Sequence, residues 1–365
     1  MDQDFSRIEF MIENGDISGA RKRVDELLKY NKKDANAHAL LSEIYMHSYD
    51  KNDLKKAIKE IKIALSIDNN PYFKFIAGAV YYTNKDYHNA IANLKENLKS
   101  DPENLDSLMF LARCYNESDK KKDALNAIIN ALKIAPNYPD AIKLKVNILM
   151  DLGRNYEALS ELKKVVKIDQ IDPEIYFNMA TIYLDLRQYD KALKSINEAK
   201  RVSNGEDDQI YELSANIYAR LHNYEAAISD LDNAIKYYDE EDSSLYLEKA
   251  AILDKAGKFD DALSLLNNIL EKDSEDSLAF FLLIRVLIHS NRMDKLMEIV
   301  EERKLNNDIK DVLNMFMNKN YLNNQNDLDG IVKIGQKYIG KDNFEANLFM
   351  AILLEIYEEI NSAGK

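Results

Sequence analysis

Residues 77–104 read AGAVYYTNKDYHNAIANLKENLKSDPEN, and residues 111–138 read LARCYNESDKKKDALNAIINALKIAPNY. Each stretch has a small residue, an aromatic residue three positions later, and a short polar segment. An alanine follows, Ala90 in the first stretch and Ala124 in the second, and then an apolar pair that precedes a proline. The two stretches therefore carry one pattern, which repeats after 34 residues.

The alanine of this pattern recurs along almost the whole chain and is replaced only in the last two copies. Its positions are 33 to 37 residues apart and are Ala20, Ala57, Ala90, Ala124, Ala158, Ala192, Ala227, Ala262, Leu296 and Gly330. A fixed period of this length is typical of solenoids, in which each repeat packs on its neighbours. We therefore expect ten repeats over residues 1–344, with starts near 1, 37, 71, 105, 139, 173, 208, 243, 277 and 311. Residues 345–365 are expected to form a C-terminal capping helix and a tail.

Each repeat contains two stretches with helical spacing of apolar residues. In one second stretch Ala90, Leu94 and Leu98 are four residues apart and so share one helix face. No stretch alternates apolar and polar residues as a strand would. All five prolines lie at the joints between repeats, where a helix can begin, and the turns between paired stretches hold Gly15, Gly153 and Gly257. The pattern predicts an all-α solenoid of antiparallel helix pairs.

The chain resembles the tetratricopeptide-repeat family. The third repeat carries the resemblance in Ala77, Gly78, Tyr81, Tyr87, Ala90, Leu94, Leu98 and Pro102. The match extends over essentially the whole chain, although Tyr176, Tyr211, Tyr246 and Phe280 stand where the family has tryptophan. The resemblance implies a right-handed superhelical solenoid whose first helices line a concave groove. It also implies a non-enzymatic scaffold or adaptor that binds a protein or peptide segment in that groove.

Composition narrows the range of partners and of cellular locations. The net charge of −14 argues against nucleic acid, because phosphate binding needs a concentration of basic residues. No stretch reaches the apolar length that a membrane helix requires, and the first ten residues do not read as a secretory signal. Cys114 is the only cysteine, which favours a reducing compartment. We therefore expect a soluble cytoplasmic protein.

Motifs for catalysis are weak. Residues 335–342, GQKYIGKD, have the spacing of a phosphate-binding loop, but Asp342 stands where magnesium coordination needs serine or threonine. Gly340 suits the end of a helix, so a nucleotide-binding enzyme is the least favoured alternative. The five histidines are scattered and show no metal-ligand spacing. We expect no enzyme activity, no metal and no cofactor.

By the resemblance, the groove has an aromatic part and a charged part. The first four repeats place Tyr82 and Phe110 in the groove. Repeats four to eight place nine acids there against four bases, Arg113, Lys143, Arg220 and Lys255. This composition predicts a basic or mixed-charge partner segment with apolar anchors, unless these are ordinary solvated helix faces.

The family's best-known groove is a carboxylate clamp for acidic chaperone tails, and this chain matches it only in part. Lys143, Asn147 and Asn178 match the clamp in type and spacing, whereas Asp208 and Glu212 fall on its last two basic positions and would repel an acidic tail. The asparagines could still hydrogen-bond a peptide backbone. The candidate groove residues are Tyr82, Phe110, Arg113, Lys143, Asn147, Asn178 and Asn216.

Residues 278–290, LAFFLLIRVLIHS, are apolar on nearly every side of the expected helix. The groove positions in this part of the chain are apolar as well, and the candidates for an interface are Phe281, Leu282, Ile288, Met315 and Phe316. Exposed apolar surface of this size indicates an interface, so a self-assembling subunit that forms a homodimer here is an alternative function. Burial of this helix by tight superhelical coiling is the other interpretation.

Overall fold

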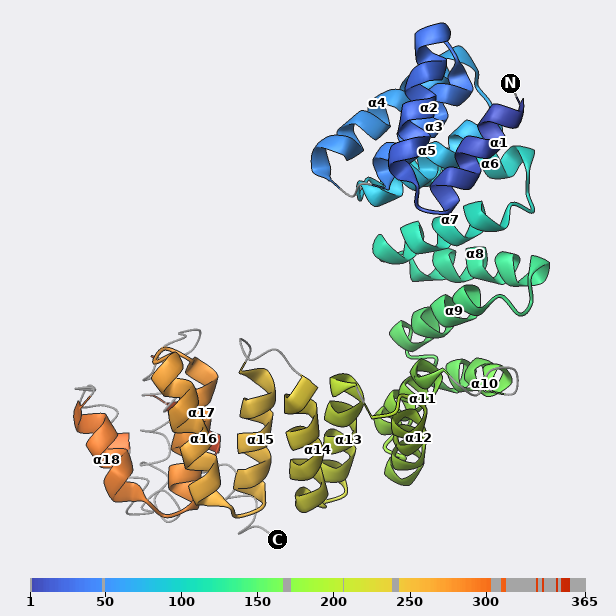
Figure 1. The fold of residues 1–365 in the computed structure, drawn as a ribbon. Helices are drawn as coiled ribbons and strands as arrows, with labels where there is room; N and C mark the ends of the chain where they lie inside the picture. The colour runs from blue at the N-terminus through green and yellow to red at the C-terminus, as the bar shows by residue number, and fades with distance from the viewer. Residues whose placement is uncertain are drawn as a thin grey trace. The chain divides into compact units, whose positions relative to one another are not determined.

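A computed structural model describes residues 2–47, 50–166, 172–205, 207–237 and 243–302, and farther on residues 310–312, 333, 337, 346 and 349–354. These residues form α-helices joined by short turns, and no strand occurs among them (Figure 1). The prediction of an all-α helical solenoid is confirmed. The chain divides into two compact units, Met1–Ile168 and Asp169–Lys365, which we call the N-terminal unit and the C-terminal unit.

The helices follow one another with only short connections. Those of the N-terminal unit are α1 (Asp2–Glu13), α2 (Ile17–Tyr30), α3 (Ala35–Met46), α4 (Lys51–Ile67), α5 (Pro71–Thr83), α6 (Tyr87–Ser100), α7 (Leu105–Glu117), α8 (Lys121–Ile134), α9 (Pro139–Asp151) and α10 (Asn155–Val165). Those of the C-terminal unit are α11 (Pro173–Asp185), α12 (Tyr189–Val202), α13 (Asp208–Arg220), α14 (Tyr224–Tyr237), α15 (Ser244–Lys255), α16 (Phe259–Lys272), α17 (Ser277–His289) and α18 (Met293–Glu302).

Consecutive helices form antiparallel pairs, such as α5 with α6 and α13 with α14. The first helix of a pair also packs on the first helix of the next pair, as α5 does on α7 and α15 does on α17. In the C-terminal unit α13 to α17 stand side by side (Figure 1). The helices α5, α7, α9, α11, α13 and α17 begin at residues 71, 105, 139, 173, 208 and 277. The tenth repeat lies mostly outside the described residues, so the division into ten stays a prediction.

In eight helix pairs of the described part of the chain, the turn between the two helices contains one residue with a left-handed backbone. Positive φ occurs there at Gly15, Lys85, Asp119, Gly153, Arg187, His222, Gly257 and Asn291. Three of the eight are the glycines that the sequence placed in these turns. The other five have a side chain, which makes the same conformation cost about 1–2 kcal/mol each. The turn geometry is therefore kept even where the sequence does not favour it.

The recurring alanine lies where two helices touch. All eight of these alanines, from Ala20 to Ala262, are fully buried, and so is Leu296, which replaces the alanine in the ninth repeat. A neighbouring position is equally crowded, because a Cβ on Gly78 would lie 2.5 Å from Cγ of Leu94. Close approach of the paired helices thus explains the small residues of the repeat pattern.

Helix α17, which contains the apolar stretch, is a core element. Ala279, Phe280, Leu282, Leu283, Ile284, Val286 and Leu287 are buried in one cluster. The same cluster contains Phe349, Ala351 and Ile352 from the helical residues 349–354, so the C-terminal segment covers part of this core.

The expectation that Leu282 lines an open groove is wrong, because only 8% of it is exposed. Phe281 and Ile288 are partly buried against the same core, and Leu278 is the exposed one, at 53%. Met315 and Phe316 lie outside the described residues. Burial accounts for the composition of this helix, and the homodimer stays a prediction.

Candidate binding cavities

A row of aromatic side chains runs across the first helices of the N-terminal unit. Its members, which we call the aromatic row, are Tyr72, Phe75, Phe110, Tyr82 and Tyr87. The ring centroids of neighbours along the row are 6.3, 6.0, 5.5 and 5.9 Å apart in that order. Helices α5 and α7 supply the first four rings, and Tyr87 is the first residue of α6. Edge and tilted contacts at this spacing are favourable for aromatic rings.

The aromatic row ends in a cavity of about 530 Å³, which we call the aromatic cavity. Its lining residues are Met46, His47, Tyr82, Thr83, Lys85, Tyr87, Phe110, Arg113 and Glu117. Three predicted groove residues, Tyr82, Phe110 and Arg113, therefore meet in one place. Arg113 also lies 3.8 Å from the carboxylate of Asp140, a half-exposed ion pair that is worth little by itself.

The two tyrosine hydroxyls of the aromatic cavity are held in the neutral form. Burial raises the pKa of Tyr82, with Arg113 opposing and Glu117 adding to the shift. Burial also raises the pKa of Tyr87, and the negative charge of Glu117 acts in the same direction. Both hydroxyls can therefore donate hydrogen bonds at neutral pH.

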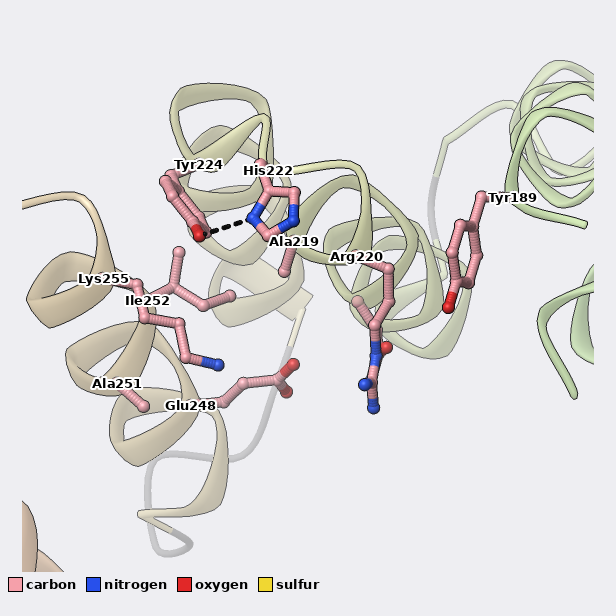
Figure 2. Close-up of a pocket in the computed structure, with 10 residues that line it drawn as sticks. Tyr189, Ala219, Arg220, His222, Tyr224, Glu248, Ala251, Ile252 and Lys255 are labelled. Carbon is pink, nitrogen blue, oxygen red and sulfur yellow. Dashed lines mark hydrogen bonds between the residues drawn. The ribbon is translucent and has the colours of Figure 1, made fainter. Parts of the chain in front are cut away.

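A second cavity, of about 650 Å³, lies in the C-terminal unit between α13 and α15, and we call it the charged cavity (Figure 2). Its lining residues are Tyr189, Asn216, Ala219, Arg220, His222, Tyr224, Glu248, Ala251, Ile252 and Lys255. His222 and Tyr224 form one edge, with Nδ1 of the histidine 2.9 Å from the tyrosine hydroxyl. The predicted groove residue Asn216 lies here.

Like charges and burial act on the carboxyl groups of this region. Burial and, to a smaller extent, the negative charge of Glu212 raise the pKa of Glu248 to about 7, while Lys255 opposes the shift. Burial and the nearby Asp208 raise the pKa of Glu212 as well. Near neutral pH the Glu248 carboxyl therefore carries only part of a negative charge.

The two cavities occupy the same place in the repeat. Tyr82, Thr83, Lys85 and Tyr87 of the aromatic cavity correspond to Ala219, Arg220, His222 and Tyr224 of the charged cavity, 137 residues further along the chain. Phe110, Arg113 and Glu117 correspond to Glu248, Ala251 and Lys255, 138 residues further along. The same positions of the repeat thus line a cavity with aromatic side chains in the N-terminal unit and a cavity with charged side chains in the C-terminal unit.

The remaining predicted groove residues line neither cavity. Lys143 is half-buried and Asn147 exposed, both on α9 of the N-terminal unit, whereas Asn178 lies half-buried on α11 of the C-terminal unit. Their part in binding stays a prediction.

Sequence reasoning missed Tyr87 and Tyr224, which wall the two cavities. They are the first residues of second helices, whereas the groove positions that the family resemblance implies lie on first helices. Tyr189 is a further tyrosine at the same place in the repeat. This recurrence of tyrosine is the signal that could have identified Tyr87 and Tyr224.

The described part of the chain contains neither a reactive cysteine nor a cluster of metal ligands. Cys114 is buried, and burial raises the pKa of its thiol to about 12, so the thiol stays protonated and unreactive. Among the described residues, no three of His, Cys, Asp and Glu come together as metal ligands, and no helix is long and apolar enough to cross a membrane. The loop-like stretch at 335–342 lies outside the described residues except for Lys337.

Comparison with known proteins agrees with the repeat architecture. A family model described as anaphase-promoting complex, cyclosome, subunit 3 matches residues 50–131. Two models described as tetratricopeptide repeat match residues 161–194 and 247–295.

Two relatives share only part of their length with this chain. The DnaJ homolog subfamily C member 3 homolog of Dictyostelium discoideum is 25% identical over 169 residues, which are 42% of this chain and 34% of the relative. The BBSome complex member BBS4 of Bos taurus is 25% identical over 125 residues, which are 34% of this chain and 24% of the relative. The chain thus spans about a third or less of either relative. A solved tetratricopeptide repeat protein from Parabacteroides merdae ATCC 43184 is 16% identical over 70% of this chain and 97% of that one, with a TM-score of 0.49.

Proposed function

We propose that this chain, a member of the tetratricopeptide-repeat family, is a non-enzymatic scaffold that binds a segment of another protein at the aromatic row. The observation that carries the proposal is the row itself. Tyr72 is 43% exposed and Phe75, Phe110, Tyr82 and Tyr87 are only partly buried, although each ring could gain free energy by being covered. The names of the similar complex subunits support a role in assembling proteins.

The chemistry around the row suggests what the bound segment contains. The rings favour apolar anchors, while Lys85, Arg113 and Glu117 border the aromatic cavity with charges of both signs. A segment with apolar side chains flanked by charged ones fits this lining. A cytoplasmic location, which the lone thiol Cys114 favours, is part of the proposal.

Affinity capture with matched variants tests the proposal. The wild-type chain, Tyr82→Ala/Phe110→Ala and a control, Phe10→Ala/Tyr156→Ala, are immobilised and the retained proteins are quantified by mass spectrometry. The control removes two aromatic side chains of the same unit that are 64% and 71% exposed and lie outside the aromatic row.

We expect one set of proteins to bind the wild type and the control but to be lost from the row variant. Circular dichroism and thermal melting establish that both variants keep the fold. Equal retention by all three proteins would refute the proposal.

A further inference from the structure

The two compact units differ strongly in charge. Residues 1–168 contain 27 basic and 25 acidic residues, whereas residues 169–365 contain 22 basic and 38 acidic residues. The negative net charge of the chain therefore belongs to the C-terminal unit. Because the charges are separated in this way, a basic face of one copy of the chain can attract an acidic face of another copy.

One side of helix α4, in the N-terminal unit, carries only lysines among its charged residues, and we call it the lysine face. Its members are exposed and three or four residues apart, and they are Lys51, Lys55, Lys59 and Lys62. Residues at this spacing lie one above the other along a helix. The lysine face points away from the core, which the other side of α4 contacts.

The two acidic residues of α4 do not neutralise the lysine face. Oδ1 of Asp53 lies 2.7 Å from Nζ of Lys56, and Oε2 of Glu60 lies 2.6 Å from Nδ1 of His38. None of the four lysines forms a hydrogen bond or ion pair with a residue that the structure describes. The lysine face is therefore free to meet negative charge from outside this part of the chain.

A third cavity, of about 380 Å³, lies between the second helices α16 and α18 of the C-terminal unit, and we call it the outer cavity. Its apolar part is formed by residues of α16, α17 and α18, which are Leu263, Leu283, Leu287 and Ile299. Apolar surface in an open cavity gains free energy when another molecule covers it.

Negative charge dominates the α18 side of the outer cavity. Glu298 and Glu302 line the cavity, and Asp294 lies one helical turn before them, so three exposed acids follow one another along α18. None of these three acids forms an ion pair or hydrogen bond with a described residue. Lys295 is the one base of α18, and Arg292 is already paired with an aspartate of α16.

We propose that the lysine face of one copy of the chain docks on the outer cavity of a second copy. The two surfaces are complementary in charge. They also match in spacing, because lysines of α4 and acids of α18 both recur every four residues, which is about 6 Å along a helix. The aliphatic stems of the lysines can cover the apolar part of the cavity while their ammonium groups reach the carboxylates.

This contact joins two different surfaces, so it is heterologous. Each docked pair keeps one lysine face and one outer cavity unused, and assemblies larger than a dimer can form. The net charge of −14 makes copies repel one another, but at physiological salt this repulsion is screened beyond about 8 Å. Exposed ion pairs are weak, so we expect a dissociation constant of about 100 μM.

Sedimentation velocity of the full chain tests the contact at protein concentrations from about 10 to 300 μM, which bracket the expected dissociation constant. The sedimentation coefficient should rise with protein concentration at physiological salt. The rise should disappear in about 0.5 M sodium chloride, because salt screens exposed ion pairs.

Charge reversal locates the two surfaces. Lys55→Glu/Lys59→Glu and Glu298→Lys/Glu302→Lys should each weaken self-association about tenfold or more, because like charges then face one another. The second variant has a smaller net negative charge, so general repulsion alone predicts the opposite result. The two reversals combined in one chain restore complementarity at the wild-type net charge and should recover self-association.

A matched control lies on another helix of the same unit. Lys122→Glu/Lys133→Glu replaces two exposed lysines of α8 and changes the net charge as much as the lysine-face variant does. It should change self-association less than about twofold. Circular dichroism establishes that every variant keeps its helices.

Several outcomes would overturn the docking of one copy on another. They are a wild type that stays monomeric at all these concentrations, equal losses in the lysine-face and control variants, and a folded combined variant that does not recover. Vesicles of phosphatidylcholine with phosphatidylserine are a further probe. If the wild type binds them through the lysine face and does not self-associate, the face belongs to a membrane surface instead.

The inference goes beyond the scaffold proposal and can fail separately from it. Tyr82→Ala/Phe110→Ala should leave self-association unchanged, because the aromatic row contains no residue of α4 or α18.

Discussion

At the scale of single residues, the left-handed turns show where the sequence and the fold disagree. Five of the eight turns inside the helix pairs place a side chain at positive φ. Asparagine and aspartate tolerate this region better than other residues, because their short polar side chains can hydrogen-bond locally. Arg187, like Lys85, has no such side chain, so we expect strain at both positions.

Arg187→Gly should stabilise the chain by about 0.5–1 kcal/mol, because the relief of strain exceeds the extra entropy that glycine loses on folding. Gly153→Ala should destabilise it by about 1 kcal/mol, although a Cβ there would meet no atom within 4 Å. The shift in the midpoint of urea unfolding measures both effects. Asn291→Gly is the control, and its gain in stability should be smaller than that of Arg187→Gly. An equal gain in stability would contradict the strain argument.

Glu248 makes folding stability depend on pH. Its pKa is raised to about 7 in the folded chain, above the ordinary 4.5, so the folded state holds the proton more tightly. Stability from this group is therefore present below about pH 4.5 and is lost as pH rises toward 7. After allowance for solvent screening, Glu248→Gln should be more stable than the wild type by about 1–2 kcal/mol near pH 8, and by less near pH 5.

Glu161 provides a contrast of opposite sign. Burial would raise its pKa, but hydrogen bonds from Lys164 and Lys145 outweigh burial and lower it. Glu161→Gln should therefore lower stability at pH 8, and the loss should fade as pH falls through the lowered pKa. Denaturant titrations at several pH values measure the stability of both variants. If the stability change depended on pH in the same way for both, the opposite roles of Glu248 and Glu161 would be contradicted.

At the scale of helices, small residues set how closely a pair can pack. Gly78→Ala should destabilise the N-terminal unit by about 1–3 kcal/mol, because the new Cβ meets the side chain of Leu94. Gly78→Ala/Leu94→Val provides space for the methyl group and should recover part of the lost stability. No recovery would indicate that the helices α5 and α6 move apart in the single variant. Urea unfolding followed by circular dichroism measures the two variants together.

The period of the sequence was sufficient to predict the helices. Spacing alone placed the start of α7 at 105 and that of α17 at 277, because each repeat buries its small residues against the next. Positions on first helices also led to Phe110 and Arg113. The cavities themselves could not be predicted, because turn residues and the first residues of second helices complete them, as Lys85 and Tyr87 do.

Leu282 shows a second limit of sequence reasoning. The pattern of one repeat predicts which side chains point away from their own helix pair. It does not predict which other segment packs against those side chains. Here residues 349–354, more than sixty positions away, contribute Phe349, Ala351 and Ile352 to the same core. Local spacing of apolar residues cannot predict this burial, because it depends on a contact with a distant part of the sequence.

At the scale of the whole molecule, each compact unit contains core clusters of its own. The clusters built on Ile8 and on Ile61 contain residues before 168 only, and the cluster around α17 contains residues after 169 only. Each unit therefore has apolar burial of its own, as independently folding domains do.

A chain ending at residue 166 should fold by itself and melt cooperatively, although the residues that follow its last helix are removed. Circular dichroism tests this expectation. The shortened chain should still bind the proteins that the aromatic-row variant loses. A helical content far below that of the same residues in the full chain would show that the N-terminal unit depends on the rest.

The equivalence of the two cavities has a consequence for how such a chain can diversify. The positions that hold the helices together, such as Ala90 and Ala227, are different from the positions that line the cavities, such as Phe110 and Glu248. Exchange of lining residues between corresponding repeats can therefore alter ligand preference while the interior stays intact. A tandem array of this kind can acquire new binding specificities one repeat at a time, with little risk to folding.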